Sequence, residues 1–188
     1  MATEEAKYAL LEKDGNFELR QYEPHIVAET MVEGDFSTVG NEGFSRLFNY
    51  ISGDNRSRRS VAMTAPVTQQ AASEKIAMTA PVGQEGDGGK WRITFVMPSL
   101  YTMETLPEPA DPKVQLKKVP GSLMAAIRYS GTWSRKRYEA KKDQLMAQIQ
   151  KRGLKPLGGA IWARYNPPFM PWFLRRNEVL IPVQRSAP

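Results

Sequence analysis

The sequence contains no cysteine and a single histidine, His25, among its 188 residues. Without cysteine, the chain has no thiolate nucleophile, no cysteine-ligated zinc site and no iron–sulfur cluster. With one imidazole, it cannot form a metal site from two histidines or a pair of axial histidines around a haem. No G-x-S-x-G motif is present to place a serine beside His25. We therefore do not expect an enzyme.

Long apolar runs are also missing. No stretch of about 18 consecutive apolar residues occurs, so we expect no integral membrane segment. The start of the chain, "MATEEAKYALLEKDG", is polar and acidic, and it lacks the basic and then apolar regions of a signal peptide. This start predicts a cytoplasmic protein, or a periplasmic or organellar one if a leader has been removed.

The composition is typical of a soluble globular domain, with 41% hydrophobic and 24% charged residues. The formal net charge of +6 favours anionic partners. The basic residues are scattered along the chain rather than gathered in one patch, which favours a simple role in solubility. We expect no nucleic-acid partner, and the composition leaves the oligomeric state open.

The first half of the chain predicts two strands followed by a helix. Residues 17–34 alternate around a turn at Glu23-Pro24, which is typical of two strands. After them, apolar residues recur at i, i+3, i+4 and i+7, as on one face of a helix: Phe44, Leu47, Phe48 and Ile51. Ser37 is the expected cap of this helix, and Gly53 is its expected end.

The same order then begins again. Residues 114–131 predict two strands, and a helix follows from Ser134 to Gly153 with an apolar stripe at Tyr138, Leu145 and Ile149. With a shift of 131 − 34 = 97 positions, Leu19 meets Leu116, Gly34 meets Gly131 and Ser37 meets Ser134. We predict one α+β domain over 1–188, built from two pseudo-symmetric β-β-α-β halves at about 8–105 and 113–184. The Pro-rich segment 106–112 joins them and is expected to be irregular.

The hexapeptide AMTAPV occurs twice, at Ala62–Val67 and Ala77–Val82. Pro66 and Pro81 have no N–H to donate to a sheet, so each copy is expected to be extended at an edge or a bulge. We interpret the second copy as an added edge segment. This doubling is separate from the 97-residue repeat, which carries no further AMTAPV.

Several strings together resemble the SOUL haem-binding protein family, from about Tyr8 to Val183: "RRSVAMTAPV", "EKIAMTAPV", "WRITFVMPS", "LPEPADP", "ARYNPP" and "RRNEV". The resemblance implies a distorted, mostly antiparallel β-barrel with two helices. It also implies non-covalent binding of haem or a related tetrapyrrole, for transport, buffering or sensing.

The family's fold is similar to gyrase-inhibitor-like effector domains, which bind diverse small molecules in a cleft between the halves. Two alternatives therefore stay open. One is a broader binding module for tetrapyrroles or other hydrophobic ligands, and the other is an enzyme acting in the same cleft.

The resemblance implies a ligand-binding role for the apolar face of the first helix, at Phe44, Leu47 and Phe48. A stripe at helical spacing is also what an ordinary core needs. Met63 and Met78, one from each AMTAPV copy, offer thioethers that ligate haem iron or pack against a flat ligand. Core filling is the alternative for both, and we favour it for at least one of them.

The segment "YNPPFMPWFLRRNEV" is the second candidate. Trp172 offers stacking area, and Arg175 and Arg176 suit the two propionates of a tetrapyrrole. Tyr165 precedes them, and Glu178 would bind a cationic ligand under the gyrase-inhibitor-like alternative. The competing interpretation is a loop folded onto the barrel with solvated arginines.

The axial ligand of a haem is a separate question. Some vertebrate relatives have a histidine before the tyrosine of the first strand, and the matching position here is Gln21, a poor iron ligand. His25 is the candidate substitute, although a lone strand histidine is more often a surface or hydrogen-bonded residue.

Overall fold

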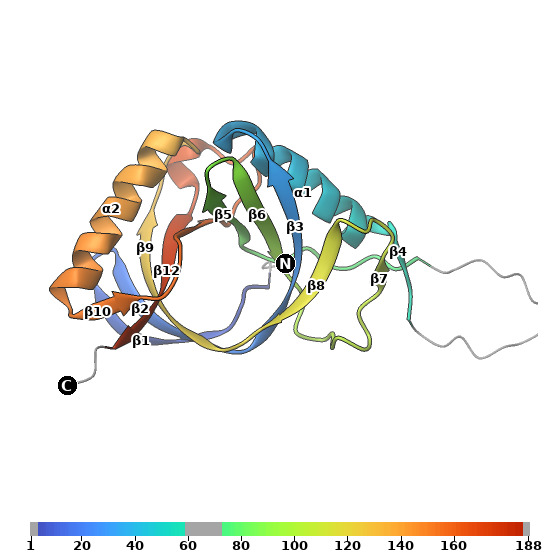
Figure 1. Ribbon diagram of the computed structural model, residues 1–188, viewed down its shortest axis with the longest axis horizontal. Helices are drawn as coiled ribbons and strands as arrows, with labels where there is room; N and C mark the ends of the chain where they lie inside the picture. Colours follow the sequence, from blue (N-terminus) through green and yellow to red (C-terminus); the bar gives the residue numbers. More distant parts are fainter. Residues whose placement is uncertain (1–3, 59–72, 186–188) are drawn as a thin grey trace, which may run out of the picture.

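The structure, a computed structural model, describes residues 4–58 and 73–185. Two helices, α1 (Phe36–Ser52) and α2 (Arg135–Lys151), lie over a curled antiparallel sheet (Figure 1). The main sheet contains β1 (Tyr8–Asp14), β2 (Phe17–Tyr22), β3 (His25–Glu33), β5 (Val82–Asp87), β6 (Lys90–Val96), β8 (Val114–Val119), β9 (Ser122–Tyr129), β10 (Leu154–Pro156), β11 (Ile161–Arg164) and β12 (Asn177–Arg185). Smaller elements are β4 (Asn55–Arg56), β7 (Glu108–Pro109) and the short 3-10 helix η1 (Trp172–Leu174). The expected α+β class with a barrel-like sheet is confirmed.

The strand order is β1-β2-β9-β12-β11-β5-β6-β3-β8, with β10 beside β12. The adjacent strands β11 and β5 lie near the middle of this order: β12, β9, β2 and β1 follow outward from β11, and β6, β3 and β8 follow outward from β5. The strands β2 and β3 follow each other in the chain but do not pair with each other. β2 pairs with β9, whereas β3 pairs with β6 and β8. This arrangement is compatible with the predicted duplication, which stays a prediction.

Both helices lie where the apolar spacing predicts them. In α2, the predicted stripe of Tyr138, Leu145 and Ile149 is buried, and the Ser134 hydroxyl caps the helix by accepting from the Arg137 backbone N–H (3.3 Å). In α1, the expected start is wrong by two residues, because the helix begins at Phe36 and Asp35 occupies the cap position.

Gly43 explains how closely α1 lies on the sheet. A Cβ added at Gly43 would lie 2.3 Å from Cγ1 of Ile93 in β6, well inside any normal contact. Only glycine lets the helix backbone reach this position. Leu47 and Ile51 follow on the same face, and both are buried in the main core.

The two faces of the sheet carry different side chains because successive residues of a strand alternate between faces. Ala125 and Ile127 of β9 belong to the large core under the helices, whereas Met124 and Ala126 form a smaller cluster on the opposite face. The sheet curls around this opposite face, where a cavity of about 200 Å³ is lined from many strands. The curvature therefore makes a half-barrel, with the helices outside it (Figure 1).

Two sequence expectations need correction. The second AMTAPV copy is not an edge segment, because its last residue, Val82, begins β5, which lies between β6 and β11. Pro81 avoids the ladder by standing just before that strand. The Pro-rich joint is not wholly irregular, since Glu108–Pro109 pairs with Asn55–Arg56. The first AMTAPV copy lies outside the described residues.

Candidate functional site

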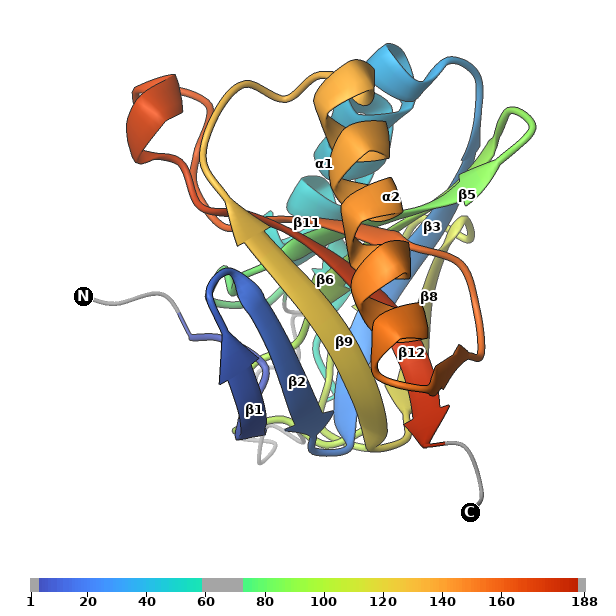
Figure 2. The same ribbon diagram turned by 90° about the vertical axis from the view of Figure 1, so that its left-hand side faces the viewer.

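A small apolar pocket opens beside α1, where the central strands of the sheet end. It has a volume of about 280 Å³, and we call it the α1 pocket. Its lining comes from α1, the AMTAPV segment, β5, β6, the loop before α2, and β11 with the loop after it: Gly40, Asn41, Phe44, Met78, Thr79, Ala80, Val82, Gln84, Ile93, Trp133, Arg164, Tyr165, Asn166, Pro167 and Pro168. In Figure 2, α1 lies behind α2, and β11 runs towards the loop that connects it to β12.

The pocket brings together three residues that the sequence singled out from distant segments: Phe44, Met78 and Tyr165. Phe48 lies one turn after Phe44, with its ring stacked on that of Phe44 (5.8 Å between centroids) and 43% exposed. Leu47, in contrast, is completely buried in the core and does not line the pocket. The predicted apolar face of α1 is thus divided between a core side and a pocket side.

Arg164 is the charged side chain of the pocket wall, and the sequence did not suggest it. Its guanidinium donates to Oε1 of Gln84 (2.7 Å) and lies over the rings of Trp162 (4.0 Å to the centroid) and Trp133 (5.0 Å). The Gln84 amide in turn donates to the Phe36 carbonyl oxygen, which fixes its orientation. Burial without a carboxylate partner lowers the pKa of Arg164 to about 10, so it remains protonated at neutral pH.

Glu178 lies on the curled face of the sheet, with its side chain fully buried. Arg20 binds it through both terminal nitrogens (2.6 and 2.9 Å), and Arg176 Nε donates to Oε1 (3.0 Å). Burial alone would raise the pKa of Glu178, but the hydrogen bonds and charges of Arg20 and Arg176 lower it below the ordinary value. The carboxylate is already neutralised within the fold, which leaves it poorly suited to bind a cationic ligand.

Tyr165 connects this network to the α1 pocket. Its hydroxyl donates to Oε2 of Glu178 (2.7 Å), while the residue also lines the pocket. Burial and the neighbouring negative charge of Glu178 raise the pKa of Tyr165 well above its usual range. The phenol therefore stays protonated and is not available as a phenolate ligand for a metal.

In the loop between β11 and β12, the arginines make contacts within the protein, whereas the aromatic rings are exposed to solvent. Arg175 donates to the carbonyl oxygens of Met170 (2.8 Å) and Pro168 (2.6 Å), and Arg176 pairs with Glu5 as well as Glu178. Trp172 is 55% exposed in η1. Phe169 and Phe173 of the same loop are exposed too. Figure 2 shows this loop and η1 projecting from the sheet.

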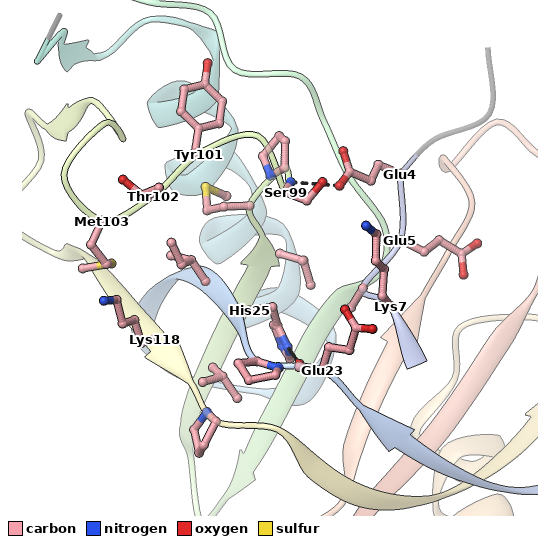
Figure 3. A pocket seen from close by; sticks show the side chains of 18 of the residues that line it. Glu4, Glu5, Lys7, Glu23, His25, Ser99, Tyr101, Thr102, Met103 and Lys118 are labelled. Atoms are coloured by element: carbon pink, nitrogen blue, oxygen red, sulfur yellow. Dashed lines mark hydrogen bonds between the residues drawn. The ribbon is translucent and has the colours of Figure 1, made fainter. Parts of the chain in front are cut away.

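His25 does not line the α1 pocket. It lies in a separate, larger cavity of about 730 Å³, which has a mixed wall that includes Lys7, Glu23, Tyr101 and Lys118 (Figure 3). His25 Nδ1 lies 2.9 Å from the Glu23 carbonyl oxygen, which can only accept, so Nδ1 is the donor in this contact.

Neither a ready-made metal site nor a membrane helix is found in the part of the chain that the structure describes. Residues 4–58 and 73–185 contain no group of three or more His, Asp or Glu side chains arranged to hold a metal ion. None of the helices within these ranges is long and apolar enough to cross a membrane.

A family model described as "SOUL heme-binding protein" matches residues 3–182. The chain belongs to the SOUL heme-binding protein family. Among curated proteins, it is similar to Heme-binding protein 2 of Homo sapiens, with 40% identity over 55 residues, 29% of this chain and 27% of the human protein. The matched segment therefore spans little more than a quarter of that relative's length.

Solved structures resemble this SOUL chain over nearly its full length. The C-terminal domain of EcmrR aligns with a TM-score of 0.60 and 10% identity, covering 90% of this chain and 98% of that one. A hydrolase from Listeria innocua aligns with a TM-score of 0.63 and 11% identity, covering 92% and 94%. At these identities the likeness shows the fold alone.

The sequence analysis of this SOUL chain did not identify most of the pocket lining, including Arg164 and the Trp133 ring that it contacts. Strand alternation offers a signal for the first: Trp162 is an obvious core residue, and position 164 lies on the same face of a strand. For Trp133, which contacts Arg164 and donates from Nε1 to Asn177 Oδ1 (2.8 Å), no local pattern predicts the contact.

Proposed function

We propose that this chain binds haem or a related tetrapyrrole non-covalently in the α1 pocket. One observation carries the proposal: Phe44, Met78 and Tyr165, from three separate segments, line a single apolar pocket with exposed aromatic rings nearby. Membership of the SOUL heme-binding protein family supports it, as does similarity to a human protein named for haem binding.

The shape of the pocket supports partial burial of the ligand. Its volume of about 280 Å³ is just below the range of typical ligand pockets, which is about 300–1,000 Å³. A macrocycle would insert one side beside Phe44 and extend over the exposed ring of Phe48. The aromatic side chains Phe169 and Trp172 of the neighbouring loop offer further stacking surface.

The residues around the pocket favour weak or no axial ligation of the iron. Tyr165 keeps its proton and gives its hydroxyl hydrogen to Glu178, and His25 lines a different cavity. Met78 remains as the thioether of the lining. A partly exposed haem that lacks a strong ligand exchanges readily, which suits transport or buffering better than permanent retention.

A haem titration tests the proposal. Wild-type protein should shift the Soret band of ferric haem and saturate at one haem per chain. Met78→Trp, which fills the pocket, should weaken binding at least tenfold. Met31→Trp is the matched control, because Met31 is an exposed methionine of β3 that does not line the pocket. Non-saturating uptake, or equal affinities for the two variants, would contradict the proposal.

A further inference from the structure

We infer that Arg164 receives a carboxylate of the ligand, so that the α1 pocket selects a planar hydrophobic acid over its neutral ester. The inference rests on the proposed function and identifies the group that recognises the charged end of the ligand. The sequence directed attention to Arg175 and Arg176 for this task, and the structure points to a different arginine.

The position of Arg164 suits this role. It is the last residue of β11, it lines the pocket wall, and its guanidinium is held by the Gln84 side chain and the two indole rings. Gly40 of α1 makes room for it, since a Cβ there would lie 3.0 Å from Nη2 of Arg164. The guanidinium is therefore fixed in place before a ligand arrives, which reduces the entropy lost on binding.

Among the sheltered arginines of the described residues, Arg164 and Arg175 have no carboxylate partner, and of these two only Arg164 lines the α1 pocket. Arg20 pairs with Glu178, Arg46 with Glu42, Arg152 with Glu12 and Asp14, and Arg176 with Glu5 and Glu178. For Arg164, no carboxylate within the described residues forms an ion pair, and its partners are a neutral amide and two aromatic rings. A desolvated charge with no counterion is an unfavourable arrangement that an anionic ligand would relieve.

The other two candidate arginines, Arg175 and Arg176, make their contacts outside the α1 pocket. Nε and Nη2 of Arg175 donate to backbone carbonyl oxygens of its own loop, and the Arg176 guanidinium binds two carboxylates. Neither lines the α1 pocket. A carboxylate that enters the pocket therefore meets the guanidinium of Arg164, whose planar fork can bind both of its oxygens.

Metal-free protoporphyrin IX and its dimethyl ester provide the test, because they differ in charge and contain no iron to ligate. Their dissociation constants are measured by quenching of tryptophan fluorescence, for wild type, Arg164→Gln and Arg175→Gln. Wild type should bind the free acid about tenfold more tightly than the ester, equivalent to about 1.4 kcal/mol. The Arg164→Gln variant should bind both equally, and Arg175→Gln should keep the wild-type ratio even if its affinity for both changes.

The outcomes separate the two proposals. If wild type binds acid and ester equally, the pocket binds porphyrins but the role of Arg164 is wrong. If neither porphyrin binds, the proposed function fails and this inference fails with it. A lost preference in Arg175→Gln with a retained one in Arg164→Gln would move the role to Arg175. Should Arg164→Gln fold poorly, Arg164→Lys should keep the preference and Arg164→Met should abolish it; the reverse pattern would overturn the inference.

Discussion

Replacing Glu178 by glutamine tests whether the buried ion pair belongs to the fold rather than to a ligand site. The substitution keeps the shape but removes the charge that two guanidinium groups face, Arg20 at 2.6 Å and Arg176 at 3.0 Å. Removing one partner of a buried pair typically costs about 3–5 kcal/mol. Both arginines retain another carboxylate, Glu18 for Arg20 and Glu5 for Arg176, so we expect the lower end, about 3 kcal/mol.

Urea unfolding followed by circular dichroism measures this change in the free energy of unfolding. For a chain of this length, a loss of about 3 kcal/mol corresponds to a fall in Tm of about 6–12 °C. Glu85→Gln is the matched control, because Glu85 forms a solvent-exposed pair with Arg92 on the same sheet, for which we expect less than about 1 kcal/mol. Equal, small losses in the two variants would refute the structural role assigned to Glu178.

The pH dependence of stability gives a second measurement on the same residue. The pKa of Glu178 is lower in the folded chain than the ordinary value of about 4.3 expected after unfolding. Its contribution is therefore complete above about pH 4.3 and is lost as the pH falls through the folded-state pKa. The difference in unfolding free energy between wild type and Glu178→Gln should shrink over that acidic range. A difference that stays constant with falling pH would contradict this linkage.

Three further substitutions have expected outcomes. Gly43→Ala should lower the free energy of unfolding by about 1–3 kcal/mol despite the better helix propensity of alanine, because the new Cβ meets Ile93; an unchanged or raised urea midpoint would contradict the close packing. His25→Ala should leave the Soret band of the haem complex unchanged, since His25 lines a different cavity, and a shifted band would assign it as a ligand. Met78→Leu should keep haem affinity within about tenfold in the same titration because the volumes are similar, whereas a larger loss would indicate a bond from sulfur to iron.

Local patterns were sufficient for the two helices and for the two strands in each of the segments 17–34 and 114–131. Apolar residues at helical spacing predicted both helices, because one face of each is buried against the sheet. The same spacing could not separate Phe44 from Leu47, because both are apolar and lie one turn apart. Only the neighbouring strands decide which of them faces the core and which faces the pocket.

Strand pairing was harder to foresee than strand identity. The second AMTAPV copy reads as an edge segment because of Pro81, yet the chain enters the central strand β5 at the very next residue. A proline standing one position before a strand leaves every ladder hydrogen bond of that strand intact, so its presence nearby does not indicate an edge. The pairing of β5 with β11 joins residues about 80 positions apart, a contact that no local pattern predicts.

The charged residues show most clearly why a site cannot be assigned from adjacent letters alone. Arg175 and Arg176 attract attention as a pair, but neighbouring residues point in different directions, and here one binds carbonyl oxygens while the other binds Glu178. The side chain available to a ligand is Arg164, which stands apart in the sequence and shares its strand face with Trp162. An arginine that already has a carboxylate gains little from an anionic ligand, whereas one without a counterion gains a full ion pair. Arg175 also has no carboxylate partner within the described residues, so the missing counterion together with a place in the pocket wall identifies Arg164 as the arginine that recognises the ligand.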